Sequence, residues 1–299
     1  KVAPGLLAET LAFCRWLRDG QFAFLGLREF RLDGDAATGD LVPIDGSGLG
    51  VLRDPTLHVL SRDGDVLAMT PEIRQFFFSA QPLIITKSSI VSRIHRRVQM
   101  DYVGLKSYSA DGVLTGELRL VGLFTSQTYT QAPGQIPFLR HKVETVIARS
   151  GYAPGSHAAK ALINVLETFP RDELFRIGDD KLADWTRGIV DLELRPRVRV
   201  FARPDRFDRF VSVLVYAQRD RFSTVVRERI RGWRRHRVAP RRRALRGLRR
   251  SRRCLHAVFP RRPAGPGPFH HRPQPRSAPR RRRAGARASH HRDHADLGR

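Results

Sequence analysis

The chain has 299 residues, a formal net charge of +26 at pH 7 and two cysteines. This length suits one to three domains. Two isolated cysteines make neither a disulfide framework nor a metal site, so we expect a reducing, cytoplasmic compartment. We expect no membrane partner, because no apolar run approaches the roughly 20 residues of a spanning helix, and we find no secretory leader.

The positive charge is concentrated in the last part of the chain. Residues 231–299 contain 23 Arg, no Lys and two acids, whereas residues 1–230 contain 32 bases and 27 acids. The tail consists mainly of Arg, Ala, Gly, Pro, His and Ser, a composition typical of disorder. The remainder has the charge balance of an ordinary, mildly basic globular protein.

Two explanations of the Arg-rich tail are open. One is a basic arm that binds nucleic acid or another polyanion without regard to sequence. The other, which we favour, is a frameshifted reading of a GC-rich gene. Selected basic arms usually use Lys as well as Arg, and this one follows the amphipathic stretch "RDRFSTVVRERI" without a linker.

The first 135 residues are predicted to be a helix followed by a sheet-rich module. Leu7, Leu11 and Leu17 recur at helical spacing, which predicts a leading helix within residues 1–20. Alternating apolar residues and turn signals predict antiparallel strands through residues 21–135. Asp111-Gly112, between "VQMDYVGLKSY" and "TGELRLVGLF", is a strong hairpin signal.

The next 60 residues, 136–195, are predicted to be helical. Three amphipathic segments lie there: "IPFLRHKVETVIARSG", "GSHAAKALINVLETF" with Ser156 as a candidate N-cap, and "DDKLADWTRGIVDLEL". Residues 196–230 then predict two strands that meet near 206–209 and a helix, the opening of another α/β module. The predicted fold class is therefore α+β.

The basic cluster in "KSSIVSRIHRRV" is the best candidate site in the sequence. Lys87, Arg93, His95 and Arg96 lie among hydroxyls, a mixture that suits a carboxylate or phosphate anion. The same residues could be charges on a sheet edge that oppose edge-to-edge pairing. We favour the sheet edge and keep an effector-facing or anion-facing role as the alternative.

Other motifs support no catalytic, cofactor-binding or metal-ligating assignment. The glycine-rich "DGSGLG" at 45–50 departs from the G-x-G-x-x-G spacing of a dinucleotide loop, and Pro55 follows too soon for a long helix. We therefore read it as an ordinary loop. Asp172 and Glu173, after Pro170, are read as the start of a helix in preference to a functional carboxylate pair.

Several long phrases resemble the large bacterial NAD-specific glutamate dehydrogenases. Between Leu6 and Ile230 they include "GSGLGVLRDP", "PLIITKSS", "IPFLRHKVETVIARSGYAPGSHAAKALINVLETFPRDELF" and "RPRVRVFARPDRFDRFVSVLVYAQRDRFST". The resemblance ends near Arg231, which agrees with a frameshift. The chain resembles a slice of the family's N-terminal regulatory half.

The resemblance implies modules of ACT-like and PAS-like type, with residues 196–230 beginning an ACT-like module that the tail truncates. Full-length members use NAD to convert L-glutamate to 2-oxoglutarate and ammonium. The resemblance implies that their catalytic domain lies outside this chain, which we expect to be inactive by itself. It also implies homo-oligomers and an amino-acid effector. A free-standing amino-acid sensor and a nucleic-acid-binding protein remain the alternatives.

Overall fold

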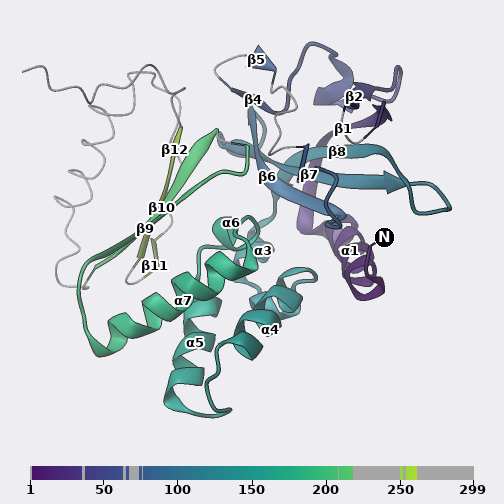
Figure 1. The fold of residues 1–299 in the computed structure, drawn as a ribbon. Helices are drawn as coiled ribbons and strands as arrows, with labels where there is room; N and C mark the ends of the chain where they lie inside the picture. The colour runs from purple at the N-terminus through teal and green to yellow at the C-terminus, as the bar shows by residue number, and fades with distance from the viewer. Residues whose placement is uncertain are drawn as a thin grey trace, which may run out of the picture. The chain divides into compact units, whose positions relative to one another are not determined.

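The computed structural model of the chain describes residues 2–35, 38–62, 65–66, 74–75, 77–207, 209–217, 250–251 and 254–260. Its helices are α1 (Pro4–Trp16), α3 (Ser126–Thr130), α4 (Leu139–Arg149), α5 (His157–Thr168), α6 (Arg171–Leu174) and α7 (Asp179–Leu194). Its strands are β1 (Phe22–Asp33), β2 (Asp40–Pro43), β3 (Leu49–Gly50), β4 (Ser61–Arg62), β5 (Asp65–Val66), β6 (Leu83–Val91), β7 (Gln99–Tyr108), β8 (Leu114–Phe124), β9 (Arg199–Pro204), β10 (Phe210–Tyr216), β11 (Arg250–Ser251) and β12 (Cys254–Pro260). Helices combined with antiparallel strands confirm the predicted α+β class (Figure 1).

The largest sheet is antiparallel, with strand order β2-β1-β8-β7-β6 and β3 added beside β1. The predicted turn at Asp111-Gly112 joins β7 to β8, and Gly112 has a positive φ of 79°. Glycine adopts this conformation without the steric cost of a side chain. Strand β6 lies at the end of the sheet, so the basic cluster does start on an edge strand.

Both faces of the sheet are buried along its strands β6, β7 and β8. Leu83, Val103 and Leu120 belong to the main core, which they share with α1 and the helices of residues 136–195. On the other face Tyr102 and Val121 pack in a second cluster with Leu52, Val59 and Phe207. The alternation of apolar and polar residues along β8 predicted that this second face of the sheet is only partly buried. In the structure, residues between β3 and β4 and in the β9–β10 turn cover it.

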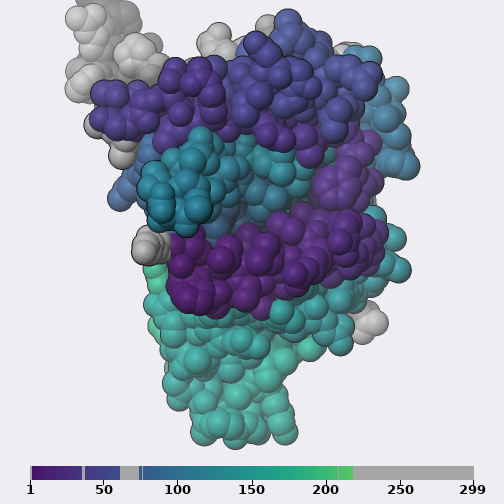
Figure 2. All heavy atoms as spheres, turned by 90° about the vertical axis from the view of Figure 1, so that its right-hand side faces the viewer, coloured from purple at the N-terminus to yellow at the C-terminus, as the bar shows by residue number. Residues whose placement is uncertain are grey.

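Helix α1 packs between the sheet and the helices that follow it. Figure 2 shows it as a purple band between strands above and α-helical residues below. The Glu9 carboxylate accepts a hydrogen bond from the backbone N–H of Phe138 and forms an ion pair with Arg140. Phe13 is fully buried, and its ring lies 6.0 Å from that of Phe175.

Helices α4, α5 and α7 pack together, as their amphipathic patterns predicted (Figure 1). Ser156 is the N-cap of α5, and its hydroxyl accepts a hydrogen bond from the N–H of Ala159 at 3.1 Å. Short α6 begins after Pro170 and has Asp172 and Glu173 in its first turn, so their predicted place at a helix start is confirmed.

The β9–β10 hairpin turns at residues 205–209, as predicted, and forms a second sheet of order β11-β12-β10-β9. Strand β12 pairs with β10 from Phe210↔Pro260 to Tyr216↔Cys254. The prediction that all of residues 231–299 are disordered is therefore wrong for β12. Its sequence, "CLHAVFP", contains no Arg, and the strand pairs with the edge of β10. The helix predicted within 219–230 and the rest of the tail lie outside the described residues.

A search of the described helices finds none with the length and apolar character needed to cross a membrane.

Candidate functional site

Lys87, the first residue of the basic cluster, lies in the middle of β6 and points inward. Its ammonium forms a short ion pair with Asp101 on the neighbouring strand β7 and lies 3.4 Å from a carboxylate oxygen of Asp172 on α6. The side chain is 14% exposed. Lys87 is thus a bridge between the sheet and α6, and its charge is already matched by two carboxylates.

Arg96 also turns inward, whereas Arg93 and His95 do not. The Arg96 guanidinium donates to the carbonyl of Phe124 at 3.0 Å and to the hydroxyl of Tyr129 at 3.4 Å. Arg93 and His95 are exposed in the β6–β7 loop. The structure therefore divides the four predicted residues into two half-buried side chains with hydrogen-bond partners, Lys87 and Arg96, and two exposed ones, Arg93 and His95.

Tyr129 connects the two inward residues. Its hydroxyl donates to Asp172 at 2.9 Å, the same carboxylate that Lys87 approaches. Burial raises the pKa of Tyr129, and the charges of Asp172 and Asp101 raise it further. Burial also raises the pKa of Asp101, against the opposing effect of Lys87. Burial is thus the largest cause of both shifts, and the neighbouring charges modify it.

A second connection joins β6 to the β9–β10 turn. The Arg209 guanidinium donates to the carbonyl of Lys87 at 2.6 Å, to the Thr86 hydroxyl at 2.8 Å and to the Asp205 carboxylate at 3.0 Å. The Thr86 hydroxyl also lies 3.2 Å from Asp205. Burial lowers the pKa of Arg209, although Asp205 acts in the opposite direction.

The third connection joins α6 to β9 and β10. The Glu173 carboxylate is fully buried. It accepts from the Arg203 guanidinium at 2.7 Å and from the Ser212 hydroxyl at 2.6 Å, and it lies 3.7 Å from Arg176. A buried carboxylate is tolerated where cations and hydrogen-bond donors surround it in this way.

Together these contacts form one polar layer, which we call the charged junction. Its members are Thr86, Lys87, Arg96, Asp101, Tyr129, Asp172, Glu173, Arg176, Arg203, Asp205, Arg209 and Ser212. They come from the large sheet and its β6–β7 loop, from α3, from α6 and the residues that follow it, and from the β9–β10 hairpin. The junction can therefore couple the positions of three parts of the chain.

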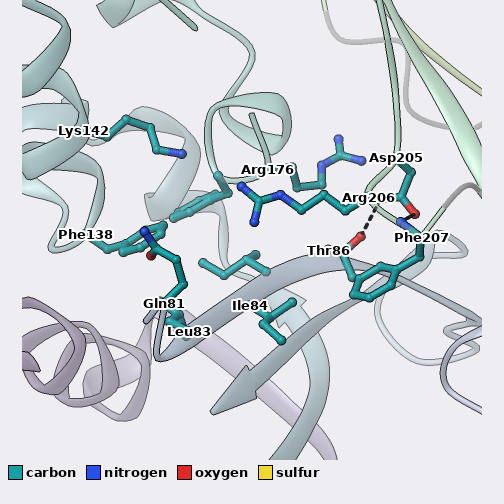
Figure 3. Close-up of a pocket in the computed structure, with 12 residues that line it drawn as sticks. Gln81, Leu83, Ile84, Thr86, Phe138, Lys142, Arg176, Asp205, Arg206 and Phe207 are labelled. Carbon is teal, nitrogen blue, oxygen red and sulfur yellow. Dashed lines mark hydrogen bonds between the residues drawn. The ribbon is translucent and has the colours of Figure 1, made fainter. Parts of the chain in front are cut away.

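A cavity of about 40 Å³ lies beside the charged junction (Figure 3). It is lined by Gln81, Leu83, Ile84, Ile85, Thr86, Phe138, Lys142, Phe175, Arg176, Asp205, Arg206 and Phe207. The buried Lys142 ammonium donates to the carbonyl of Leu174 at 3.1 Å and to that of Ile177 at 2.6 Å. Burial lowers the pKa of Lys142 to about 8.

The glycine-rich loop does not fit a dinucleotide. Gly50, its last residue, has a φ of 59°, and a side chain there would meet the carbonyl oxygen of Leu25 at 2.2 Å. The helical turn that follows, Val51–Arg53, has three residues, so it offers no helix N-terminus of useful length to a pyrophosphate. Gly50 allows a close approach to β1 and Gly48 a close approach to the Leu52 carbonyl, whereas Gly46 has no heavy atom within 4 Å of its Cβ position.

Sequence reasoning missed most of the junction. Asp101 carries a detectable signal, because it is the acid inside the largely apolar stretch "VQMDYVGL". Glu173 does not, since Arg171 and Asp172 precede it and suggest an exposed turn of helix. Arg203, Arg209 and Ser212 carry no comparable signal, since they lie in a hairpin where exposed polar residues are common. Their burial arises from packing between segments distant in sequence.

Two family models match the chain. One, described as glutamate dehydrogenase, helical motif 1, covers residues 136–195 and therefore includes α4 to α7. The other, described as glutamate dehydrogenase, ACT2 domain, covers residues 199–238 and includes β9 and β10. This second match continues beyond Ile230, where the sequence analysis placed the end of the resemblance. The charged junction thus joins both matched segments to the preceding sheet.

Curated relatives agree with these matches. NAD-specific glutamate dehydrogenase of Halomonas elongata is 35% identical over 222 residues, which are 72% of this chain. That of Pseudomonas aeruginosa is 36% identical over 217 residues, again 72% of the chain. That of Mycobacterium tuberculosis is 31% identical over 201 residues, or 67% of the chain. The matches cover 13%, 13% and 11% of the respective relatives.

Proposed function

The chain belongs to the family of NAD-specific glutamate dehydrogenases, and we propose that its described part is a regulatory and assembly segment without a catalytic site of its own. In this proposal the full-length protein oxidises L-glutamate to 2-oxoglutarate and ammonium with NAD in the cytoplasm, and residues outside this chain perform the chemistry. The names of the matching family models, a helical motif and an ACT domain, support a regulatory role.

The observation that carries the proposal is the charged junction. Lys87 links the sheet to α6, Glu173 links α6 to β9 and β10, and Arg209 links the β9–β10 turn back to β6. Each link is a charge-assisted hydrogen bond or a close ion pair in a buried setting, where such contacts are strong and directional. A closed loop of three links resists independent movement of any one part.

An effector or a neighbouring subunit would act on this junction through the β6–β7 loop. Arg93 and His95 are exposed there and suit an acidic group. Arg96, on the same loop, reaches inward to Tyr129 and through it to Asp172. A contact that moves the loop would therefore alter the hydrogen bonds of the junction. An amino-acid carboxylate is the effector chemistry that we propose.

The first test is an activity assay of the purified chain with L-glutamate and NAD, followed by NADH absorbance. We expect no turnover above a blank without enzyme. Glutamate-dependent reduction of NAD by the chain would overturn the proposal that it lacks a catalytic site.

The second test grafts the described segment into a full-length relative. The matching segment of the Pseudomonas aeruginosa enzyme would be replaced by that of this chain, with and without Arg209→Met. We expect the wild-type graft to assemble and turn over, and the Arg209→Met graft to lose assembly or effector response. Arg149→Gln serves as the matched control for assembly and effector response, because Arg149 is exposed on α4, outside the junction and the β6–β7 loop. Identical assembly and effector response in all three grafts would contradict a coupling role.

A further inference from the structure

The β9–β10 hairpin has one face in the main core and an outer face that points away from it. Phe201 and Leu214 are buried in that core together with Trp185 of α7. Successive residues of a strand point to opposite faces, so the residues that alternate with these two form the outer face. It consists of Val200, Ala202 and Pro204 on β9 and of Val211, Val213 and Val215 on β10.

The outer face is apolar throughout and partly open. Its residues form one continuous surface, because they stand opposite one another in three cross-strand pairs: Val200↔Val215, Ala202↔Val213 and Pro204↔Val211. Val200 is 58% exposed, and so is Val198, which precedes β9 in the same alternation. A sheet face that meets water normally carries polar residues. We therefore expect a further segment to cover this one.

The chain that follows β10 has an apolar stripe of its own. Residues 219–230, "RDRFSTVVRERI", lie outside the described residues, and their pattern predicts an amphipathic helix. Arg229 would lie on the apolar side of that helix, where its aliphatic stem can cover apolar surface while the guanidinium reaches the edge. The other residues on that side are Phe222, Val225, Val226 and Ile230.

The length of the segment matches the outer face. A helix over residues 219–230 is roughly 18 Å long at 1.5 Å per residue, and the seven residues of β10 span roughly 23 Å. Ala217 and Gln218 connect the strand to the segment, and connections of this length are common between a strand and a helix. The helix would therefore return along β10 in the opposite direction.

The family comparison places the hairpin and the segment in one domain. The match to the ACT2 domain covers residues 199–238, which include β9, β10 and residues 219–230. A domain has its own hydrophobic core. A segment tethered by a short connection also competes with any free partner at an effective concentration on the order of millimolar. The outer face therefore suits this segment better than a second copy of the chain.

We infer that residues 219–230 form an amphipathic helix that docks on the outer face of β9 and β10 and runs antiparallel to β10. The docked helix closes this face to other subunits, so assembly of the protein uses another surface. The inference does not depend on the proposed regulatory function, because it follows from the hairpin, the segment and their shared domain.

The test is disulfide trapping in the full chain, with the native cysteines removed by C14A and C254A. Val213→Cys, in the middle of the outer face, is combined in turn with Val225→Cys, Val226→Cys or Thr224→Cys. Thr224 lies about 160° around a helix from Val226, so T224C is the matched control. Mild oxidation is followed by mass spectrometry, which distinguishes links within a chain from links between chains.

We expect V213C to form an intramolecular disulfide with V225C or V226C at least about five times faster than with T224C, because only the apolar side of the helix meets the sheet. Equal rates for all three pairs, or no disulfide in any of them, would overturn the inference. If V213C forms mainly disulfides between chains, a second copy covers the outer face, and the inference is wrong as well.

Hydrogen exchange supplies a measurement that needs no cysteine. In the wild-type chain we expect the amides of residues 225–230 to exchange at least about 100 times more slowly than in an unfolded chain. Val226→Asp places a charge on the apolar stripe and should remove at least about nine-tenths of this protection, whereas Thr224→Asp should keep most of it. Exchange at the unfolded rate in the wild type, or equal losses in the two variants, would contradict docking.

Discussion

Two buried carboxylates of this molecule have different kinds of neighbours. Glu117 lies inside the large sheet, where it accepts from Tyr102 on β7 and from Arg119 on its own strand β8 at 2.9 Å. Glu173 lies in the charged junction, where its partners Arg203 and Ser212 come from a different part of the chain. Both are at most 2% exposed.

The comparison teaches that equal burial does not mean equal function. Loss of Glu117 should weaken the sheet that contains it, because its hydrogen-bond partners Tyr102 and Arg119 lie on β7 and on β8 itself. Loss of Glu173 should release α6 from β9 and β10. A substitution at each position, with the same readouts, therefore separates the stability of one module from the coupling between modules.

The largest effect is expected for Glu173→Ala. The substitution leaves the guanidinium groups of Arg203 and Arg176 buried without their carboxylate, and breaking a buried pair in this way costs about 3–5 kcal/mol. Urea unfolding measures the loss, and hydrogen exchange should show α6 and the β9–β10 hairpin losing protection together. Glu193→Ala, at an exposed position of α7, is the control. A loss below about 1 kcal/mol for E173A would show that the junction does not depend on Glu173.

The next effect is a pH dependence that reports Lys142. Its folded pKa of about 8 lies below the ordinary 10.5, so between these values the unfolded chain binds more protons. Stability should therefore rise with pH from about 8 to 10.5, by at most about 3 kcal/mol from this group. The gain is absent below pH 8 and complete above 10.5. Denaturant melts of wild type and Lys142→Met across this range measure the difference.

Lys106 sharpens the comparison between sheet and junction. Burial also lowers its pKa to about 8, but its ammonium donates to the carbonyl of Ser79 at 2.7 Å beside the sheet. Lys106→Met should likewise reduce the rise of unfolding free energy between pH 8 and 10.5, without changing the hydrogen-exchange protection of α6. Lys160→Met should leave the slope as it is in wild type. If the unfolding free energy of the Lys142→Met variant rises with pH as steeply as that of the wild type, the lowered pKa of Lys142 is contradicted.

A smaller and more local effect is expected for Glu117→Gln. The amide keeps the shape and one acceptor but loses the charge that faces Arg119, so the cost should be about 1–3 kcal/mol. Hydrogen exchange should increase along β7 and β8 and stay unchanged in α6 and β9–β10. If E117Q loosens α6 as much as E173A does, the two carboxylates belong to a single cooperative unit and the distinction fails.

Much of the fold could be predicted because local patterns specify it. Helical spacing identifies α4, α5 and α7, Ser156 is recognisable as an N-cap, and Asp111-Gly112 specifies the hairpin. Each of these signals acts within a few residues of sequence. Strand β12 was missed because the Arg-rich composition around it outweighed its seven-residue pattern.

The site was predicted only in part, because contacts distant in sequence build it. The pattern around residues 87–97 indicated anion chemistry, but an isolated sequence cannot show that Lys87 meets Asp172 or that Arg209 reaches the carbonyl of Lys87. These pairs are 85 and 122 residues apart. Direction matters as much as distance: Arg96 points inward, while Arg93, three residues earlier, is exposed.

The smallest expected effect concerns the exposed loop itself. His95 has a φ of 60°, a left-handed conformation that costs a non-glycine residue about 1 kcal/mol or more. His95→Gly relieves this strain but increases the freedom of the unfolded chain, so the net effect should be a stabilisation below about 1 kcal/mol. Arg97→Gly is the matched control, because Arg97 is exposed in the same loop and is not among the residues with positive φ. It should destabilise by about 0.5–1 kcal/mol. Urea melts of the two variants should therefore differ in sign. A clear destabilisation by H95G would mean that the imidazole has a structural partner, and His95 would then no longer be available to an effector.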